Sequence, residues 1–261
     1  MRRTTGGPDS LRSMELLEWN ARSYDSLPLP HLRWGEGVIG QLELAGGETV
    51  ADIGCGTGRD AERLLGLLPR GRVVVVDGSE QMLAQMRTRL AGRLDRVDVV
   101  RADLRRPLAL PRQVDAAISV ATLHWLPDHT VVFESVARAL RPGGRFVAEA
   151  GGLGNIASVR AILADLGVDD GSGAWQFAGA QETADRLAAA GFDQIDARVV
   201  PDPARLQPGA QIEEFLATVV LGAVLRDMPE PERAPFVHTV AQRLEEPVID
   251  YVRLQLSATR P

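Results

Sequence analysis

Residues 49–59 read TVADIGCGTGR, and this stretch decides the fold. It opens with a short apolar run, breaks at Gly54 and then carries glycine at every second position through Gly58. A helical pattern follows, with Leu64 and Leu68 on its apolar face. A strand, a glycine turn and a helix in this order form the first half of a βαβ nucleotide-binding unit. Glycine suits the turn because the backbone bends sharply there and a ligand can lie against it without an intervening Cβ atom.

The spacing of the glycines narrows the choice of ligand. It is G-x-G-x-G over Gly54, Gly56 and Gly58, whereas dinucleotide enzymes use G-x-G-x-x-G. No G-K-[ST] sequence ends the turn, which excludes the phosphate-binding loop of NTPases. The stretch resembles the first motif of the class I S-adenosylmethionine (SAM)-dependent methyltransferases, whose turn holds the amino-acid end of a cofactor without phosphate. The alternative is a tight turn that binds no ligand.

Asp77 follows the β-branched run of residues 72–76, which reads as a buried parallel strand. It lies about 20 residues beyond the glycine turn, where doubly wound folds place an acid on the ribose hydroxyls. An ionised carboxylate can accept hydrogen bonds from both hydroxyls. The alternative is a helix N-cap, but Ser79 already suits that role.

Two later stretches are similar to the same family. In that family an acid after the third strand accepts a hydrogen bond from the adenine amine, and the next residue packs on the ring; Asp103 and Leu104 match these positions. An acid in a loop turn is the alternative for Asp103. Residues 139–144, ALRPGG, are a further family-like signature before the fifth strand. The arrangement is most similar to the trans-aconitate methyltransferase-like group and to bacterial small-molecule methyltransferases.

The resemblance and the patterns together predict an α/β fold. We expect a doubly wound, Rossmann-like, seven-stranded sheet with an antiparallel last strand, an N-terminal helical cap and a helical insertion before the last strand. The expected boundaries are a disordered tail at 1–10, a cap at 11–48 and a core at 49–261 with its insertion at 201–247. Prolines predict an extended segment at 27–35. Alternating apolar residues predict the last strand at 248–257.

The resemblance implies SAM as cofactor and S-adenosylhomocysteine as its product. Two aromatic residues of the N-terminal cap, Tyr24 and Trp34, are candidates for the pocket, although they can equally pin this segment to the core. The complete set of residues expected to bind the cofactor is Tyr24, Trp34, Asp52, Gly54, Cys55, Gly56, Asp77, Gly78, Met82, Ala102, Asp103, Leu104 and Val120.

Methyl transfer is a displacement at an already activated carbon, so alignment of the reactants carries much of the rate. A base is needed only if the acceptor must lose a proton. His124, which follows the fourth strand, is the first candidate for this base, and Glu149, at the end of the fifth strand, is the second. His124 can alternatively orient its loop, and Glu149 can be a hydrated acid at the strand end.

Composition excludes several other functions. The net charge of -6 argues against binding of nucleic acids or a membrane surface. All 29 basic residues are arginine, so chemistry that needs lysine is excluded, and the single cysteine, Cys55, excludes a disulfide framework. We expect no metal site, no signal peptide and no membrane span, and a cytoplasmic location. The high content of Ala, Gly, Arg and Val also indicates a GC-rich bacterial genome.

The sequence thus predicts a SAM-dependent methyltransferase that acts on a small organic molecule through a carboxylate, hydroxyl or activated carbon, as a monomer or homodimer. Two alternatives remain open. One is a SAM-binding protein without methyl transfer, either a regulator or a catalyst of cyclisation. The other is a nicotinamide-dependent oxidoreductase, which the glycine spacing disfavours.

Overall fold

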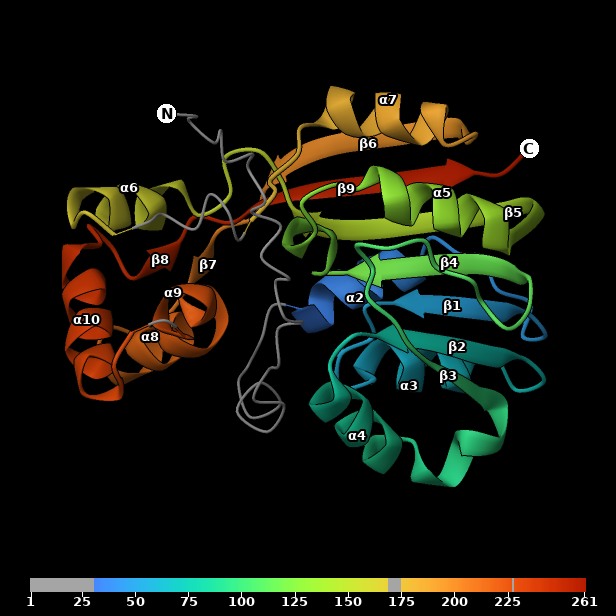
Figure 1. Cartoon of the computed structure of the whole chain (residues 1–261), viewed down its shortest axis with the longest axis horizontal. Coiled ribbons are helices and arrows are strands. Elements are labelled where there is room, and N and C mark those ends of the chain that lie inside the picture. The colour runs from blue at the N-terminus through green and yellow to red at the C-terminus, as the bar shows by residue number, and fades with distance from the viewer. Residues whose placement is uncertain (1–30, 169–174, 227) are drawn as a thin grey trace, which may run out of the picture.

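The computed structural model describes residues 31–168, 175–226 and 228–261 (Figure 1). Its main feature is a seven-stranded sheet in the order β3-β2-β1-β4-β5-β9-β6. The strands are β1 (Thr49–Ile53), β2 (Arg72–Asp77), β3 (Val97–Arg101), β4 (Val114–Val120), β5 (Leu140–Gly151), β6 (Asp193–Pro201) and β9 (Val252–Thr259). Strands β1 to β5 pair in parallel, and β9 runs antiparallel to both of its neighbours, β5 and β6. The predicted fold class is confirmed.

Helices cover both faces of the sheet, as its strand sequences require. In β1, Val50 faces one apolar layer while Ala51 and Ile53 face the other, and all three are fully buried. The first layer contains α2 (His31–Ile39), α3 (Arg59–Leu67) and α4 (Glu80–Arg89). The second contains α5 (Thr130–Ala139) and α7 (Ala180–Ala189). Two 3₁₀ helices are present in the described residues: η1 (Ala91–Arg96) lies between α4 and β3, and η2 (Leu123–Trp125) lies between β4 and α5.

A third apolar cluster lies beyond the carboxyl ends of the parallel strands (Figure 1). It joins α6 (Ala157–Asp165) to the elements between β6 and β9. These are the short strands β7 (Ala204–Arg205) and β8 (Val248–Ile249), the helices α8 (Ala210–Phe215), α9 (Gly222–Arg226) and α10 (Glu230–Arg243), and the π-helix η3 (Leu216–Val220). Its centre includes Phe215, Leu216 and Val240, each at most 1% exposed. The insertion therefore has a core of its own, set against the edge of the sheet where ligands bind.

Two sequence-based predictions are wrong in detail. Residues 31–35 are helical, not extended, because Pro28 and Pro30 restrict the residues before them and leave those after them free to start a helix. The predicted final strand divides into β8 and β9, because Tyr251 N–H donates to the Ile249 carbonyl (2.8 Å) in a tight turn. The expected tail and most of the expected cap, residues 1–30, lie outside the described residues.

Candidate functional site

A cavity lies at the carboxyl ends of the parallel strands, where open α/β sheets bind ligands. On one side it is lined by residues that end or follow four strands: Gly54 and Gly56 after β1, Asp77 and Gly78 at β2, Ala102, Asp103 and Leu104 after β3, and Val120, Ala121 and Thr122 at β4. On the other side it is lined by Trp34 of α2, by Trp175 and Phe177 before α7, by Val219 and Ala223 of the insertion, and by Arg253 of β9.

The glycine turn is fixed to the neighbouring strand. The N–H groups of Gly54 and Cys55 both donate to the Val76 carbonyl, at 2.8 and 2.9 Å. A Cβ atom on Gly54, whose φ is +81°, would lie 2.2 Å from Oγ1 of Thr122. A Cβ atom on Gly56, whose φ is +52°, would meet no atom within 4 Å in the described structure. Gly54 therefore serves close packing, whereas Gly56 keeps open the space beside the cavity.

Asp77 links the glycine turn to the start of α4. Its Oδ2 accepts from the Gly56 N–H and its Oδ1 from the Ser79 N–H, both at 2.9 Å. Ser79 caps the helix as predicted, since its hydroxyl accepts from the Met82 N–H at 3.2 Å. The carboxylate of Asp77 is thereby held in one orientation at the cavity wall, next to Met82.

Asp103 lines the cavity together with the arginine that binds it. Arg105 donates to both carboxylate oxygens of Asp103 at 2.9 Å, and its backbone N–H adds a third hydrogen bond at 3.0 Å. These contacts with Arg105 hold the pKa of Asp103 below its usual range. An adenine amine would therefore have to share this carboxylate with Arg105.

Three carboxylates gather behind the glycine turn. Asp52 is 1% exposed, and its pKa is raised by burial and by the charges of Asp60 and Asp77. Burial raises the pKa of Asp60 to about 6. Neither Asp52 nor Cys55, whose thiol pKa is also raised by burial, lines the cavity itself. Because burial favours the neutral form of Asp52, the negative charge beneath the turn comes from Asp60 once it is ionised, above about pH 6, and this charge favours a cation above the turn.

His124 enters the cavity from η2, directly after β4. The Gly151 N–H donates to its Nδ1 at 3.2 Å, so the neutral imidazole carries its proton on Nε2. The His124 carbonyl accepts from the Gln176 N–H at 2.8 Å, which fixes the segment that bears Trp175 and Phe177. In this tautomer the Nε2–H of His124 is a hydrogen-bond donor, and the role of His124 as a base stays a prediction.

An aromatic wall continues from His124. The rings of Trp175 and Phe177 stack at 5.9 Å with an angle of 16° between their planes. Trp125 lies 6.3 Å from Trp175, and Phe177 lies 6.1 Å from the imidazole of His124. This wall belongs to the half of the cavity farther from the glycine turn and offers contacts to an apolar or unsaturated carbon body.

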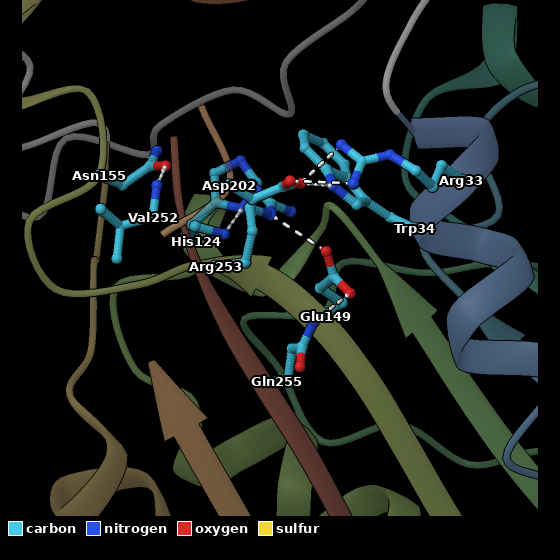
Figure 2. Close-up of polar contacts among 10 residues, drawn as sticks. Arg33, Trp34, His124, Glu149, Asn155, Asp202, Val252, Arg253 and Gln255 are labelled. Atoms are coloured by element: carbon cyan, nitrogen blue, oxygen red, sulfur yellow. Dashed lines mark hydrogen bonds and ion pairs between the residues drawn. The ribbon is translucent and has the colours of Figure 1, made fainter. Parts of the chain in front are cut away.

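Glu149 lies beneath this half of the cavity and does not line it. It is 5% exposed, and its carboxylate accepts from Arg253 Nε at 3.3 Å and from Gln255 Nε2 at 3.2 Å (Figure 2). Burial raises the pKa of Glu149 in spite of these partners. Its contacts are those of a residue that orients Arg253.

The structure brings most of the predicted site residues together around one cavity. Those that line it are Trp34, Gly54, Gly56, Asp77, Gly78, Met82, Ala102, Asp103, Leu104, Val120 and His124. Tyr24 lies outside the described residues. Arg253, Trp175 and Phe177 were missed. The alternation in VRLQL at residues 252–256 places Arg253 on the face opposite two buried leucines, a pattern that by itself predicts an exposed strand residue and gave no signal of a site.

Nowhere in the described ranges do three or more His, Cys, Asp or Glu side chains gather in a way that could hold a metal ion. Along residues 31–168, 175–226 and 228–261, no helix combines the length and apolarity needed to cross a bilayer.

Part of the chain is similar to a known protein family. Residues 50–144, which include the glycine turn, Asp77 and Asp103, match the protein-family model described as "Methyltransferase domain". This match covers a little over a third of the chain. Trans-aconitate 2-methyltransferase of Azoarcus sp. (strain BH72) is 34% identical over 126 residues, 48% of this chain and 48% of that protein. The chain therefore spans about half the length of the curated relatives it matches.

Solved structures share the fold of most of this chain. A phosphoethanolamine N-methyltransferase 2 of Haemonchus contortus, in complex with phosphomonomethylethanolamine and S-adenosylhomocysteine, gives a TM-score of 0.60 at 17% identity, over 88% of this chain and 52% of that one. The [4+2]-cyclase SpnF also gives 0.60, at 21% identity, over 88% of this chain and 80% of that one. Both likenesses concern the fold alone.

Proposed function

We propose that this chain transfers the sulfonium methyl group of SAM to a small organic acceptor. One observation carries the proposal: the glycine turn, Asp77 and Asp103 meet along one cavity inside residues that match a methyltransferase domain. The relatives named trans-aconitate 2-methyltransferase support an organic acid as the first acceptor to test.

The residues around the cofactor half of the cavity fit SAM. The Gly56 position leaves room beside the backbone, and the oriented Asp77 carboxylate suits a ribose diol. Met82 and Leu104 are buried apolar side chains at the cavity wall and can pack on an adenine ring. The carboxylate of Asp60, once ionised above about pH 6, favours the positive ammonium and sulfonium groups of SAM. When bound, SAM supplies an activated methyl group.

The chain's own task is then to bind and align the acceptor. Trp125, Trp175 and Phe177 exclude water from one side of the acceptor and position its carbon body. His124 can donate from Nε2 to an acceptor oxygen and so orient the nucleophile. His124 and Glu149 as general bases remain predictions from the sequence. We further propose a cytoplasmic bacterial enzyme.

The test separates SAM binding from methyl transfer. Calorimetry of the full chain with SAM and with S-adenosylhomocysteine measures binding first. Radiolabelled methyl-SAM is then incubated with the chain and a panel of small organic acids that includes trans-aconitate, and labelled products are counted. Tight SAM binding without any labelled product would support the alternative of a SAM-binding protein without methyl transfer. Failure to bind SAM would refute the proposal.

A further inference from the structure

Arg253 is a buried arginine on the wall of the cavity. It is 2% exposed and lies at the start of β9, three strands away from β1 in the order β1-β4-β5-β9. Neighbouring strands are about 4.8 Å apart, so β9 runs roughly 14 Å from β1. His124, after β4, lies on the strand ends between them. Arg253 therefore belongs to the acceptor half of the cavity, away from the glycine turn.

Two contacts orient this guanidinium, and its surroundings are drawn in Figure 2. Its central carbon lies 3.6 Å from the centroid of the Trp34 ring, and its Nε donates to Glu149. The Trp34 ring is itself fixed, because its Nε1–H donates to Asp202 at 2.6 Å. Asp202 in turn accepts two hydrogen bonds from Arg33, both at 2.9 Å. The guanidinium is thus part of a chain of contacts that runs from Glu149 through Trp34 to Asp202.

One end of the guanidinium remains unsatisfied. Nη2 of Arg253 is buried and has no hydrogen-bond partner among the described residues of the chain. Leaving a donor of a buried charge unpaired is unfavourable, and native structures retain such a group where a ligand completes it. The local charges also leave a place for an anion. Of the two nearby acids, Glu149 pairs with Arg253. Asp202 is already bound by Arg33 and Trp34.

We propose that Arg253 is the residue that selects the acceptor, by binding a carboxylate of the acceptor at its Nη2 edge. The carbon body of this acid packs on the aromatic wall of Trp125, Trp175 and Phe177. This inference rests on the proposed function and assigns its acceptor class. A guanidinium edge matches the planar geometry of a carboxylate. Glu149 already balances part of the Arg253 charge, so a monoanionic carboxylate fits better than a dianionic phosphate.

The test uses four probes that differ in one group or in size. Benzoate and trans-aconitate carry carboxylates, benzamide is the neutral counterpart of benzoate, and phenyl phosphate carries a dianion. Each is titrated calorimetrically into the full chain, with and without S-adenosylhomocysteine. The wild-type chain is expected to bind at least one carboxylate, and to bind benzoate more tightly than benzamide or phenyl phosphate.

The variants test whether Arg253 causes the preference for benzoate. Arg253→Met is expected to weaken carboxylate binding by about 30-fold or more, because a buried charge pair loses one partner. Benzamide and S-adenosylhomocysteine should bind as before. Arg253→Lys keeps the charge and should restore part of the preference for benzoate. Arg198→Met, on the exposed side of neighbouring β6, is the matched loss of one arginine and should change nothing.

Loss of folding is controlled separately. Arg253→Met leaves Glu149 without its cation, so the double variant with Glu149→Gln removes the buried charge and keeps the carboxylate test valid. The proposal is overturned if neither carboxylate binds the wild-type chain, if binding survives Arg253→Met, or if phenyl phosphate is preferred. Failure of S-adenosylhomocysteine to bind counts against the proposed function alone, because the probes are also titrated without it.

Discussion

The two halves of the cavity are built around groups of opposite charge, with acids beneath the glycine turn and a buried arginine in the acceptor half. Behind the glycine turn, Asp52, Asp60 and Asp77 lie close enough for burial and mutual repulsion to raise the pKa of Asp52. In the acceptor half, Nη2 of Arg253 has no hydrogen-bond partner among the described residues. In the proposed reaction a cationic cofactor meets the negative half and an anionic acceptor meets the positive half. Each partner is then drawn to its own end of the cavity before the reaction.

The two halves also differ in how the chain builds them. The cofactor half comes from one contiguous stretch, residues 50–104, in which each strand is followed directly by its ligand-facing residue. The acceptor half is assembled from α2, η2, the segment before α7 and β9, which are far apart in the sequence. Substitutions in the first half should therefore change SAM affinity and leave acceptor affinity intact. Substitutions in the second half should do the reverse.

The largest expected effect concerns Asp77. In Asp77→Ala, two hydrogen bonds to the ribose and the two backbone contacts of this carboxylate are lost together. Two charge-assisted hydrogen bonds correspond to about 3–6 kcal/mol of SAM binding, or a 10²–10⁴-fold weaker affinity. Calorimetry with SAM measures the loss. Asp77→Asn retains one acceptor oxygen and should lose less, and unchanged affinity in a folded Asp77→Ala would remove the ribose assignment.

A substitution of Asp60 tests the negative potential of the cofactor half. Its pKa is about 6 in the folded chain against 3.8 for an ordinary aspartate. Between about pH 4 and 6 the folded state therefore holds a proton that the unfolded state has released. The free energy of unfolding falls as pH rises through this range. Asp60→Asn should raise the free energy of unfolding by about 2–3 kcal/mol at pH 8, and the gain should vanish below about pH 4.

Urea unfolding at a series of pH values measures this effect. Glu245→Gln, an exposed acid after α10, is the matched removal of one charge and should produce no such pH dependence. A gain in Asp60→Asn that persists unchanged at acidic pH would show that the carboxylate charge is not its cause. SAM affinity of Asp60→Asn should fall at the same time, because the cation above the turn loses a favourable charge.

The glycine turn allows stability and binding to be separated within the cofactor half. Gly54→Ala forces a Cβ atom against Thr122 at a positive φ and should cost about 2 kcal/mol of folding stability. Gly56→Ala places its Cβ where no described atom lies within 4 Å, and should cost only about 1 kcal/mol. Its methyl group instead occupies space beside the cavity and should weaken SAM binding. Equal losses of stability in the two variants would contradict this division.

The sequence predicted the two halves unequally, for a physical reason. The turn at Gly54, the acid at Asp77 and the cap at Ser79 follow from local backbone chemistry, since each acts on residues next to it in the chain. Arg253 could not be recognised in this way. Its role depends on Trp34 and Glu149, which lie 219 and 104 positions earlier in the sequence and reach it only through the fold.

Local rules also fail where a strand changes partners. The last apolar run was predicted as one strand because its alternation continues through residue 257. The turn at Tyr251 instead sends its first part to β7 and its second part between β5 and β6. That change of sheet places Arg253 on the wall of the cavity, so the error in the strand and the missed residue have the same origin.

The smallest expected effect concerns His124, which lies between the two halves of the cavity. Substitutions of this residue distinguish a hydrogen-bond donor from a general base. If Nε2–H donates to an acceptor oxygen, His124→Gln keeps a donor. His124→Phe should then lower kcat/KM by only about 2–10-fold, since a neutral hydrogen bond is worth about 0.5–1.5 kcal/mol. A general base would cost about 10²–10⁴-fold in both variants.

The measurement is kcat/KM over a pH series, with the acceptor found by the labelling experiment. The donor role predicts that His124→Gln stays close to the wild type and keeps its pH profile, because Gly151 N–H occupies the Nδ1 lone pair that a base would use. Loss of more than about 100-fold in His124→Gln would instead establish the base and require this hydrogen bond to break during turnover.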